Sequence, residues 1–215
     1  MKKLLSIASL IISLAGRNAH GQAYFLFQSN SKAVWENFTT GEGPSVIAPA
    51  GTVNIAFLVG SGTPLIGTSG SPTNVDVFEN SPFVWNNLLS DPNFHLATNA
   101  NTGQTAITTT LGNGAFVYNA ASSFPVVGTT PGTTYNVFVI GWESVFGATP
   151  QAAAAAGGLV GWSNTFPYTP GIVIDTEPNF TFAGMQPFGL VIPEPSVFSL
   201  ASLGAMSLAF YRRRK

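Results

Sequence analysis

Turn-forming residues interrupt the middle of this chain so often that its apolar runs stay short. Glycine, proline, asparagine, serine and threonine separate stretches that are rich in β-branched and aromatic residues. Such stretches favour strands, and such separators favour turns. Residues 52–59 show the alternation of a strand most clearly, because Val53, Ile55 and Phe57 share one face. The pattern predicts an all-β fold with many short strands.

The strand pattern continues along most of the chain. Pro131 and Gly132 form a turn before residues 134–142, where both faces of the strand are largely apolar. A strand that is apolar on both faces is expected in the middle of a sheet. The predicted strands are residues 24–28, 33–38, 52–59, 105–111, 115–118, 134–142, 159–166, 171–174 and 188–192.

Two short helices are expected between the strands. Thr149 caps the first one, Pro150 takes its first helical position, the alanines of 152–156 continue it, and two glycines end it. A second helical turn is predicted within residues 81–89. The number and spacing of the strands indicate a β-sandwich of the jelly-roll or immunoglobulin-like type.

The start of the chain has the pattern of a secretory signal peptide. Two lysines precede an apolar stretch at residues 4–15, as in the positive and hydrophobic regions of such peptides. Small residues allow a cut after Gly21 or after Ala23, so the mature chain is expected to begin at Gln22 or Tyr24. This leader predicts export, with signal peptidase as a processing partner.

The end of the chain combines three features. Two prolines fix the backbone around Glu194, so a helix can begin only after Pro195. Residues 197–211 are then apolar or small, and as a helix they reach roughly 22 Å, short of the roughly 30 Å hydrocarbon core of a bilayer. The terminal cations are expected to stop transfer and stay cytoplasmic. The motif is Pro193, Glu194, Pro195 and Ser196, and the cations are Arg212, Arg213, Arg214 and Lys215.

This order of motif, short apolar helix and basic end resembles the PEP-CTERM sorting signal of Gram-negative bacteria. The resemblance implies recognition by an exosortase, a membrane-embedded cysteine transpeptidase that cuts near the motif and passes the protein toward the cell surface or the exopolysaccharide matrix. It also implies a C-terminal transmembrane helix in the inner membrane. The alternative is a plain tail anchor with accidental prolines. The expected organisation is a signal peptide at 1–23, a β-sandwich domain at 24–190 and a sorting signal at 191–215.

Between the two signals the chain is acidic. Residues 24–192 hold a single basic side chain, Lys32, against eight carboxylates, a net charge of about −7. Such a surface is a poor partner for nucleic acid or for anionic lipid. The sequence has no cysteine, so neither a disulfide nor a thiolate contributes. We therefore expect one domain that its hydrophobic core stabilises without covalent cross-links.

Few residues of the body suit acid–base or metal chemistry. His95 is the only histidine between the signals, and we expect it on the surface or in a turn. Asp175 and Glu177 could share a strand face, but a glycosidase needs two carboxyls about 5 to 9 Å apart across a cleft. Carboxylates could also bind calcium, yet none has the spacing of a calcium loop. The sequence therefore predicts no catalytic residue, no metal site and no cofactor.

The tryptophans suggest an alternative to a purely structural role, namely sugar binding. The chain has four, and exposed indoles could stack on sugar rings, although we expect most aromatic side chains in the core. Trp35 and Trp142 are the better candidates, because the neighbouring Glu36 and Glu143 point to the opposite strand face. We expect an exported structural or adhesive protein that is not an enzyme. The alternatives are an exopolysaccharide-binding module and, last, a glycoside hydrolase.

Overall fold

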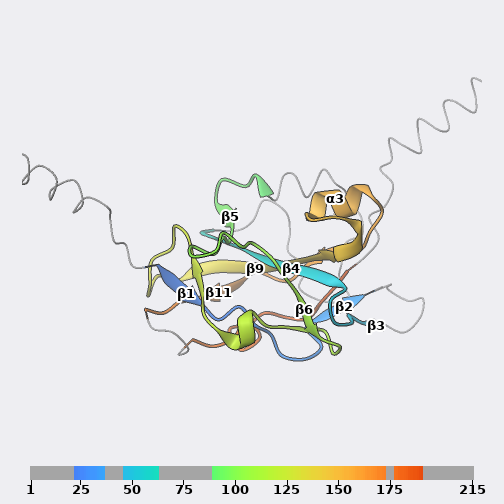
Figure 1. Cartoon of the computed structure of the whole chain (residues 1–215). Helices are drawn as coiled ribbons and strands as arrows, with labels where there is room; N and C mark the ends of the chain where they lie inside the picture. The colour runs from blue at the N-terminus through green and yellow to red at the C-terminus, as the bar shows by residue number, and fades with distance from the viewer. Residues whose placement is uncertain (1–21, 37–45, 63–88, 173–176, 191–215) are drawn as a thin grey trace, which may run out of the picture.

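The computed structural model describes residues 22–36, 46–62, 89–172 and 177–190 (Figure 1). Strands dominate these residues, and a single α-helix, α3 (Pro150–Ala155), is accompanied by short 3₁₀ turns. The all-β prediction is therefore confirmed. The predicted signal peptide, the sorting tail and nearly all of the second predicted helix lie outside the described residues.

Two long strands form the centre of the largest sheet. β4 (Val53–Gly60) and β9 (Tyr135–Glu143) pair antiparallel from Val53–Glu143 to Gly60–Asn136. Both are buried on both faces over most of their length, which confirms the central position predicted for residues 134–142. Around them lie β5 (Phe94–Leu96), β6 (Ile107–Leu111) and β7 (Ala115–Phe116) on the β4 side, and β10 (Val160–Trp162) and β11 (Phe166–Tyr168) on the β9 side.

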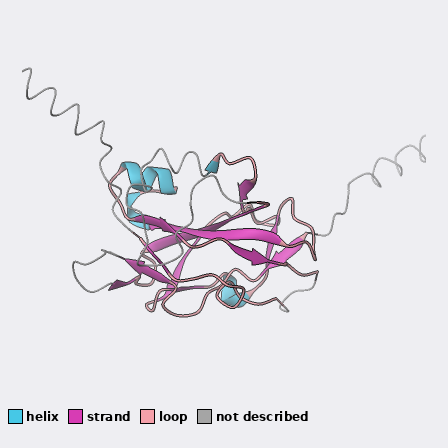
Figure 2. Ribbon diagram, turned by 180° about the vertical axis from the view of Figure 1, so that it is seen from behind, coloured by secondary structure: helices cyan, strands magenta, loops and turns pink. Residues whose placement is uncertain are grey.

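Two smaller sheets complete the strand architecture. In one, β1 (Ala23–Phe25) pairs antiparallel with β8 (Phe124–Val126). In the other, β2 (Val34–Glu36) lies between β3 (Val46–Ile47) and β12 (Phe188–Gly189), which runs parallel to β2. Figure 2 shows the long central strands with α3 on one side and the smaller sheets on the other.

The alternation of side chains along β4 and β9 divides the hydrophobic core into two clusters. The larger one is rich in phenylalanine: Phe57 lies 4.7 Å from Phe27 and 5.1 Å from Phe180, measured between ring centroids. The smaller one, on the opposite face, contains Trp142 and Trp162 and is covered by α3. Aromatic packing from segments far apart in sequence therefore stabilises the body, as a chain without cysteine requires.

Helix α3 follows the predicted start and stop signals. The Thr149 hydroxyl accepts a hydrogen bond from the backbone N–H of Ala152 at 3.2 Å, and Pro150 occupies the first turn. Gly157 follows with a φ of 79°, the left-handed conformation that glycine adopts without strain. The prediction for this helix is confirmed.

The strand predicted at residues 159–166 divides into β10 and β11 because Ser163 interrupts the ladder. Its hydroxyl accepts a hydrogen bond from the N–H of Val139 at 2.9 Å and donates one to the carbonyl of Asn164 at 2.8 Å. A side chain thus replaces one backbone partner of β9, which lets the edge turn from β10 to β11 without leaving a buried N–H unpaired.

The left-handed turn at Asn119, Ala120 and Ala121 stores backbone strain. Asn119, Ala120 and Ala121 have φ values of 40°, 55° and 71°, where the Cβ of an L-residue meets the following carbonyl oxygen at a cost of about 1–2 kcal/mol per residue. Ala120 is exposed, so its methyl group contributes no packing that would offset this cost.

We expect Ala120→Gly to raise the free energy of unfolding by roughly 0.5–1 kcal/mol, since relief of strain exceeds the added entropy of glycine in the unfolded chain. The matched control is Ala152→Gly in α3, which is also exposed and should lower the free energy by about 1 kcal/mol. Urea unfolding at equilibrium measures both. A similar loss of stability in the two variants would contradict the left-handed turn.

Candidate functional site at the tail-proximal end

The structure separates the two tryptophans that were candidates for sugar stacking. Trp142 is 3% exposed, belongs to the cluster under α3, and donates a hydrogen bond from Nε1 to the carbonyl of Gly147 at 3.0 Å. A ring enclosed in the core offers no face to a ligand, so the structure contradicts a stacking role for Trp142. The physical reason is that β9 is a central strand with both faces covered.

Trp35 remains at the surface, on β2. Its side chain is half-buried, and its Nε1 donates to the carbonyl of Lys32 at 2.9 Å. Its own carbonyl accepts the N–H of Leu190 at 2.9 Å. Trp162 is buried like Trp142. Among the described residues, Trp35 is therefore the indole that can meet a partner.

Two carboxylates lie near Trp35, and both accept hydrogen bonds from the chain itself. Glu36 Oε1 accepts from the hydroxyl of Thr52 at 2.5 Å. Glu143 pairs with Val53 across the β4–β9 ladder, and its Oε2 accepts from the N–H of Leu159 at 2.7 Å. The first bond joins β2 to the residue before β4, and the second joins the end of β9 to the residue before β10, which is a structural use of carboxylates.

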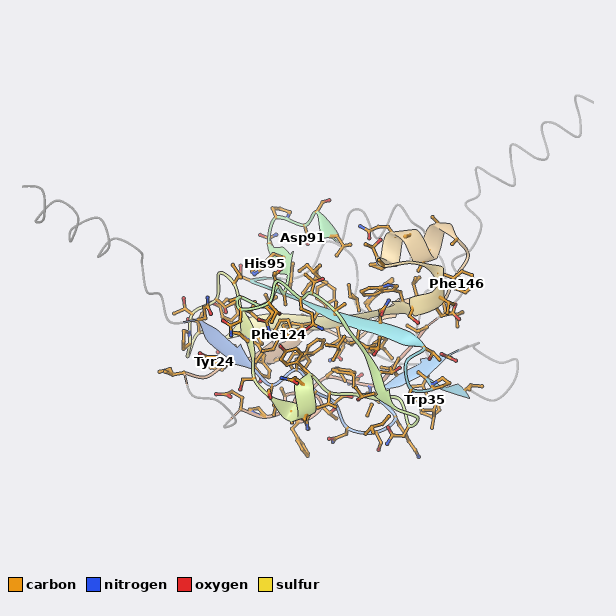
Figure 3. All side chains as sticks on the ribbon, in the orientation of Figure 1. Tyr24, Trp35, Asp91, His95, Phe124 and Phe146 are labelled. Atoms are coloured by element: carbon orange, nitrogen blue, oxygen red, sulfur yellow. The ribbon has the colours of Figure 1, made fainter. Side chains whose placement is uncertain are left out.

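The turn before β4 joins these elements into one end of the molecule. Ser144, at the start of a 3₁₀ turn η3 (Ser144–Phe146), donates from its N–H to the carbonyl of Thr52 at 2.9 Å and from its hydroxyl to that of Gly51 at 3.1 Å. Figure 3 shows Trp35 and Phe146 at this end and Tyr24 at the other. We call it the tail-proximal end; it comprises Lys32, Trp35, Glu36, Val46, Thr52, Glu143, Val145 and Phe146.

We name this end after the tail because Leu190, which precedes the predicted sorting signal in the sequence, is bonded to Trp35 there. Leu190 is fully buried and lies against Gly141, where an added Cβ would come within 3.1 Å of Leu190 Cδ2. The hydrogen bond from Leu190 to Trp35 therefore fixes the last described residue at this end. Pro193, the first residue of the sorting motif, follows shortly after it in the sequence. The motif and the terminal cations themselves lie outside the described residues.

The remaining candidates for chemistry lie apart from this end. His95 is exposed on β5, in agreement with the expected surface position. Asp175 lies outside the described residues. The carboxylate of Glu177 lies against Gly171, where it fills the space that a Cβ would occupy. Within the described residues, no group of three or more histidine, aspartate or glutamate side chains could hold a metal ion.

Tyr168 is a structurally important residue that the sequence did not single out. Its hydroxyl accepts the N–H of Leu26 at 2.9 Å and donates to the carbonyl of Pro178 at 3.0 Å. It thus joins the N-terminal and C-terminal segments of the body. Burial raises the pKa of Tyr168 above its ordinary value, the bond from Leu26 opposes this, and the charge of Glu177 adds to the rise.

We expect Tyr168→Phe to lower the free energy of unfolding by about 1–3 kcal/mol at neutral pH, because two partly buried hydrogen bonds, each worth about 0.5–1.5 kcal/mol, are lost. The raised pKa means that the fold favours the neutral phenol. This stabilisation is present below the unfolded pKa of about 10 and is lost as the pH rises above it. The wild type should therefore lose its advantage over Tyr168→Phe in alkaline solution. A difference in thermal midpoint that stays constant from pH 7 to pH 11 would contradict this.

Among the residues that the structure describes, no helix combines the length and the apolar character needed to cross a bilayer.

In comparisons with known proteins, no protein-family model, no curated protein and no solved structure matches the chain.

Proposed function

We propose that this protein is an exported β-sandwich protein without catalytic activity, which an exosortase delivers to the cell surface, the outer envelope or the extracellular matrix. There the body has a structural or adhesive role. Signal peptidase and exosortase act on the two ends of the chain, and the inner membrane holds the C-terminal helix before processing. The acidic body excludes nucleic acid as a partner.

The observation that carries this proposal is the position of the body between the two signals. The first described strand begins at Ala23, and the last described residue is Leu190. The leader precedes this segment, and the PEP-CTERM-like tail follows it. Every described strand thus lies between the two signals, and cuts after Gly21 and near residues 193–196 would remove none of them. Ala23 itself is fully buried and pairs with Val126, so the structure supports a mature chain that begins at Gln22 rather than Tyr24.

The composition of the body supports a structural rather than a catalytic role. Its smaller sheets lie on one face of the main sheet (Figure 2), which favours the sandwich type. The carboxylates of Glu36 and Glu143 accept hydrogen bonds from the chain. The exopolysaccharide-binding alternative retains Trp35 alone of its two named residues, because Trp142 is buried.

The experiment is a surface-accessibility assay in two otherwise identical Gram-negative hosts, one with an exosortase and one without. The full chain is expressed in both, and intact cells and medium are treated with protease. The proposal expects the body to be surface-exposed or in the medium only where the exosortase is present. A body that stays protected in both hosts would contradict delivery to the surface. Equal exposure in both would contradict the role of the exosortase.

A further inference from the structure

Exposed apolar side chains lie at the tail-proximal end, where Leu190 is also held. Val145 is 81% exposed and Val46 is 48% exposed, and Phe146 is exposed beside Val145. Val46 pairs with Glu36 in the β2–β3 ladder, and the carboxylate of Glu36 accepts a hydrogen bond from the hydroxyl of Thr52. The carbonyl of Thr52 in turn accepts the N–H of Ser144, the first residue of η3. The hydrogen bonds thus connect the strand that carries Val46 with the turn that carries Val145 and Phe146. The exposed parts of these side chains gain no stability from packing within the body.

Trp35 and Lys32 give the same end the character of a membrane interface. Indoles are enriched where an apolar phase meets water, since the ring is apolar and its N–H is polar. Lys32 is exposed, and it is the only basic side chain of the body. The carbonyl of Lys32 accepts the indole N–H of Trp35, so the two residues are held together.

We propose that the tail-proximal end rests on the membrane surface while the tail is inserted, with Val46, Val145 and Phe146 in the headgroup region and Trp35, on the opposite face of β2, at its border. This inference depends on the proposed function for the insertion of the tail. The lipid surface is then the partner of the tail-proximal end, and this end faces the membrane before the exosortase acts.

The length of chain after Leu190 limits how far the body can move from the bilayer. Val197 begins the apolar stretch, and seven residue steps of at most 3.6 Å span no more than about 25 Å. A domain of roughly 170 residues has a radius of gyration of about 15 Å. The tether is therefore comparable to the radius of the body, and the end that carries Leu190 stays next to the surface.

Charge is a minor contribution to this contact. The body is acidic, so anionic lipid does not attract it as a whole, and Glu36 and Glu143 lie at the same end as Lys32. Lys32 offsets one of these two carboxylates. The contact therefore rests on apolar burial and on the tether, and it should persist on vesicles of neutral phosphatidylcholine.

The absence of cysteine makes the orientation measurable with single reporters. The full chain is reconstituted in phosphatidylcholine vesicles as four variants: Val46→Cys and Val145→Cys at the tail-proximal end, and Val127→Cys and Ile172→Cys near Tyr24. The pairs are matched in exposure, at 48% and 50% for Val46 and Val127 and at 81% and 75% for Val145 and Ile172. Each thiol carries the same fluorophore, and a lipid-attached quencher reports its proximity to the bilayer. We expect at least threefold stronger quenching at positions 46 and 145.

Vesicle flotation separates the two claims. If the chain floats with the vesicles and all four positions are quenched equally, the orientation is wrong while insertion of the tail stands. Stronger quenching at positions 127 and 172 than at positions 46 and 145 would also show that the orientation is wrong. If the chain does not float, membrane insertion fails, and the proposed function and this inference fall together.

A charge placed in the contact should release it. With the reporter at position 46, Val145→Glu should bring quenching down to the level seen at position 127, since a carboxylate is costly in the interface. Ile172→Glu is the matched control and should leave the signal unchanged. Both substitutions are at exposed positions, so folding is preserved. A signal at position 46 that is insensitive to Val145→Glu would overturn the inference.

Discussion

Phe57→Ala is expected to lower the free energy of unfolding by about 3–5 kcal/mol, the largest effect of any single substitution proposed for this protein. Phe57 is fully buried in β4 and contacts the rings of Phe25, Phe27, Phe124 and Phe180. Its removal leaves a cavity where four chain segments meet. Since a domain is stable by only about 5–15 kcal/mol, a large part of the folded population should be lost on mild heating.

The matched control for this variant is Phe182→Ala. Phe182 is 76% exposed, so the same change should alter the free energy of unfolding by no more than about 0.5 kcal/mol. Thermal and urea unfolding followed by far-ultraviolet circular dichroism compare the two. Equal effects at positions 57 and 182 would mean that the phenylalanine cluster is not the centre of the core.

Pro193→Ala combined with Pro195→Ala is expected to prevent processing of the tail. Without the two prolines, Glu194 is no longer held in an extended backbone, and a helix can extend back from residue 197 through the motif. The exosortase would then meet a helical segment in place of an accessible strand. The expected result is a full-length protein that stays in the inner-membrane fraction even where the enzyme is present.

Pro187→Ala is the control for the double variant, because it removes an exposed proline from the same part of the chain but outside the motif. It should be processed like the wild type. Membrane fractionation and an antibody to the body read out both proteins. Normal processing of the double variant would contradict this prediction, because it would show that the exosortase does not need the two prolines.

Local signals in the sequence were sufficient for several elements of this fold. The alternation in residues 52–59 and the two apolar faces of 134–142 predict β4 and β9, since the periodicity of a strand is local information. Thr149 and Pro150 likewise place α3, because capping depends on neighbouring residues. These elements needed no knowledge of what packs against them.

Other elements depend on contacts that the sequence does not display. β5 and β8 are three residues long and acquire their hydrogen bonds from β4 and β1, so their own pattern was too short to read. β10 and β11 looked like one strand because the role of Ser163 requires β9 as a partner. Tertiary context thus determined these strands.

At the candidate site, too, local sequence signals were readable and tertiary contacts were not. The two faces of a strand could be read from sequence, but the layer that covers each face could not, so Trp142 was proposed as exposed and is buried under α3. The bonds from Tyr168 join residues that are far apart in the chain. By contrast, the motif and cations of the tail are contiguous, and their interpretation needs no fold.

The most direct test of the account is the intact mass of the mature protein from cells with and without an exosortase. We predict a chain that ends near residues 193–196 only where the enzyme is present, and that begins at Gln22 in both hosts. A mass that includes Lys215 in both hosts would contradict the central claim and leave a membrane-tethered all-β protein.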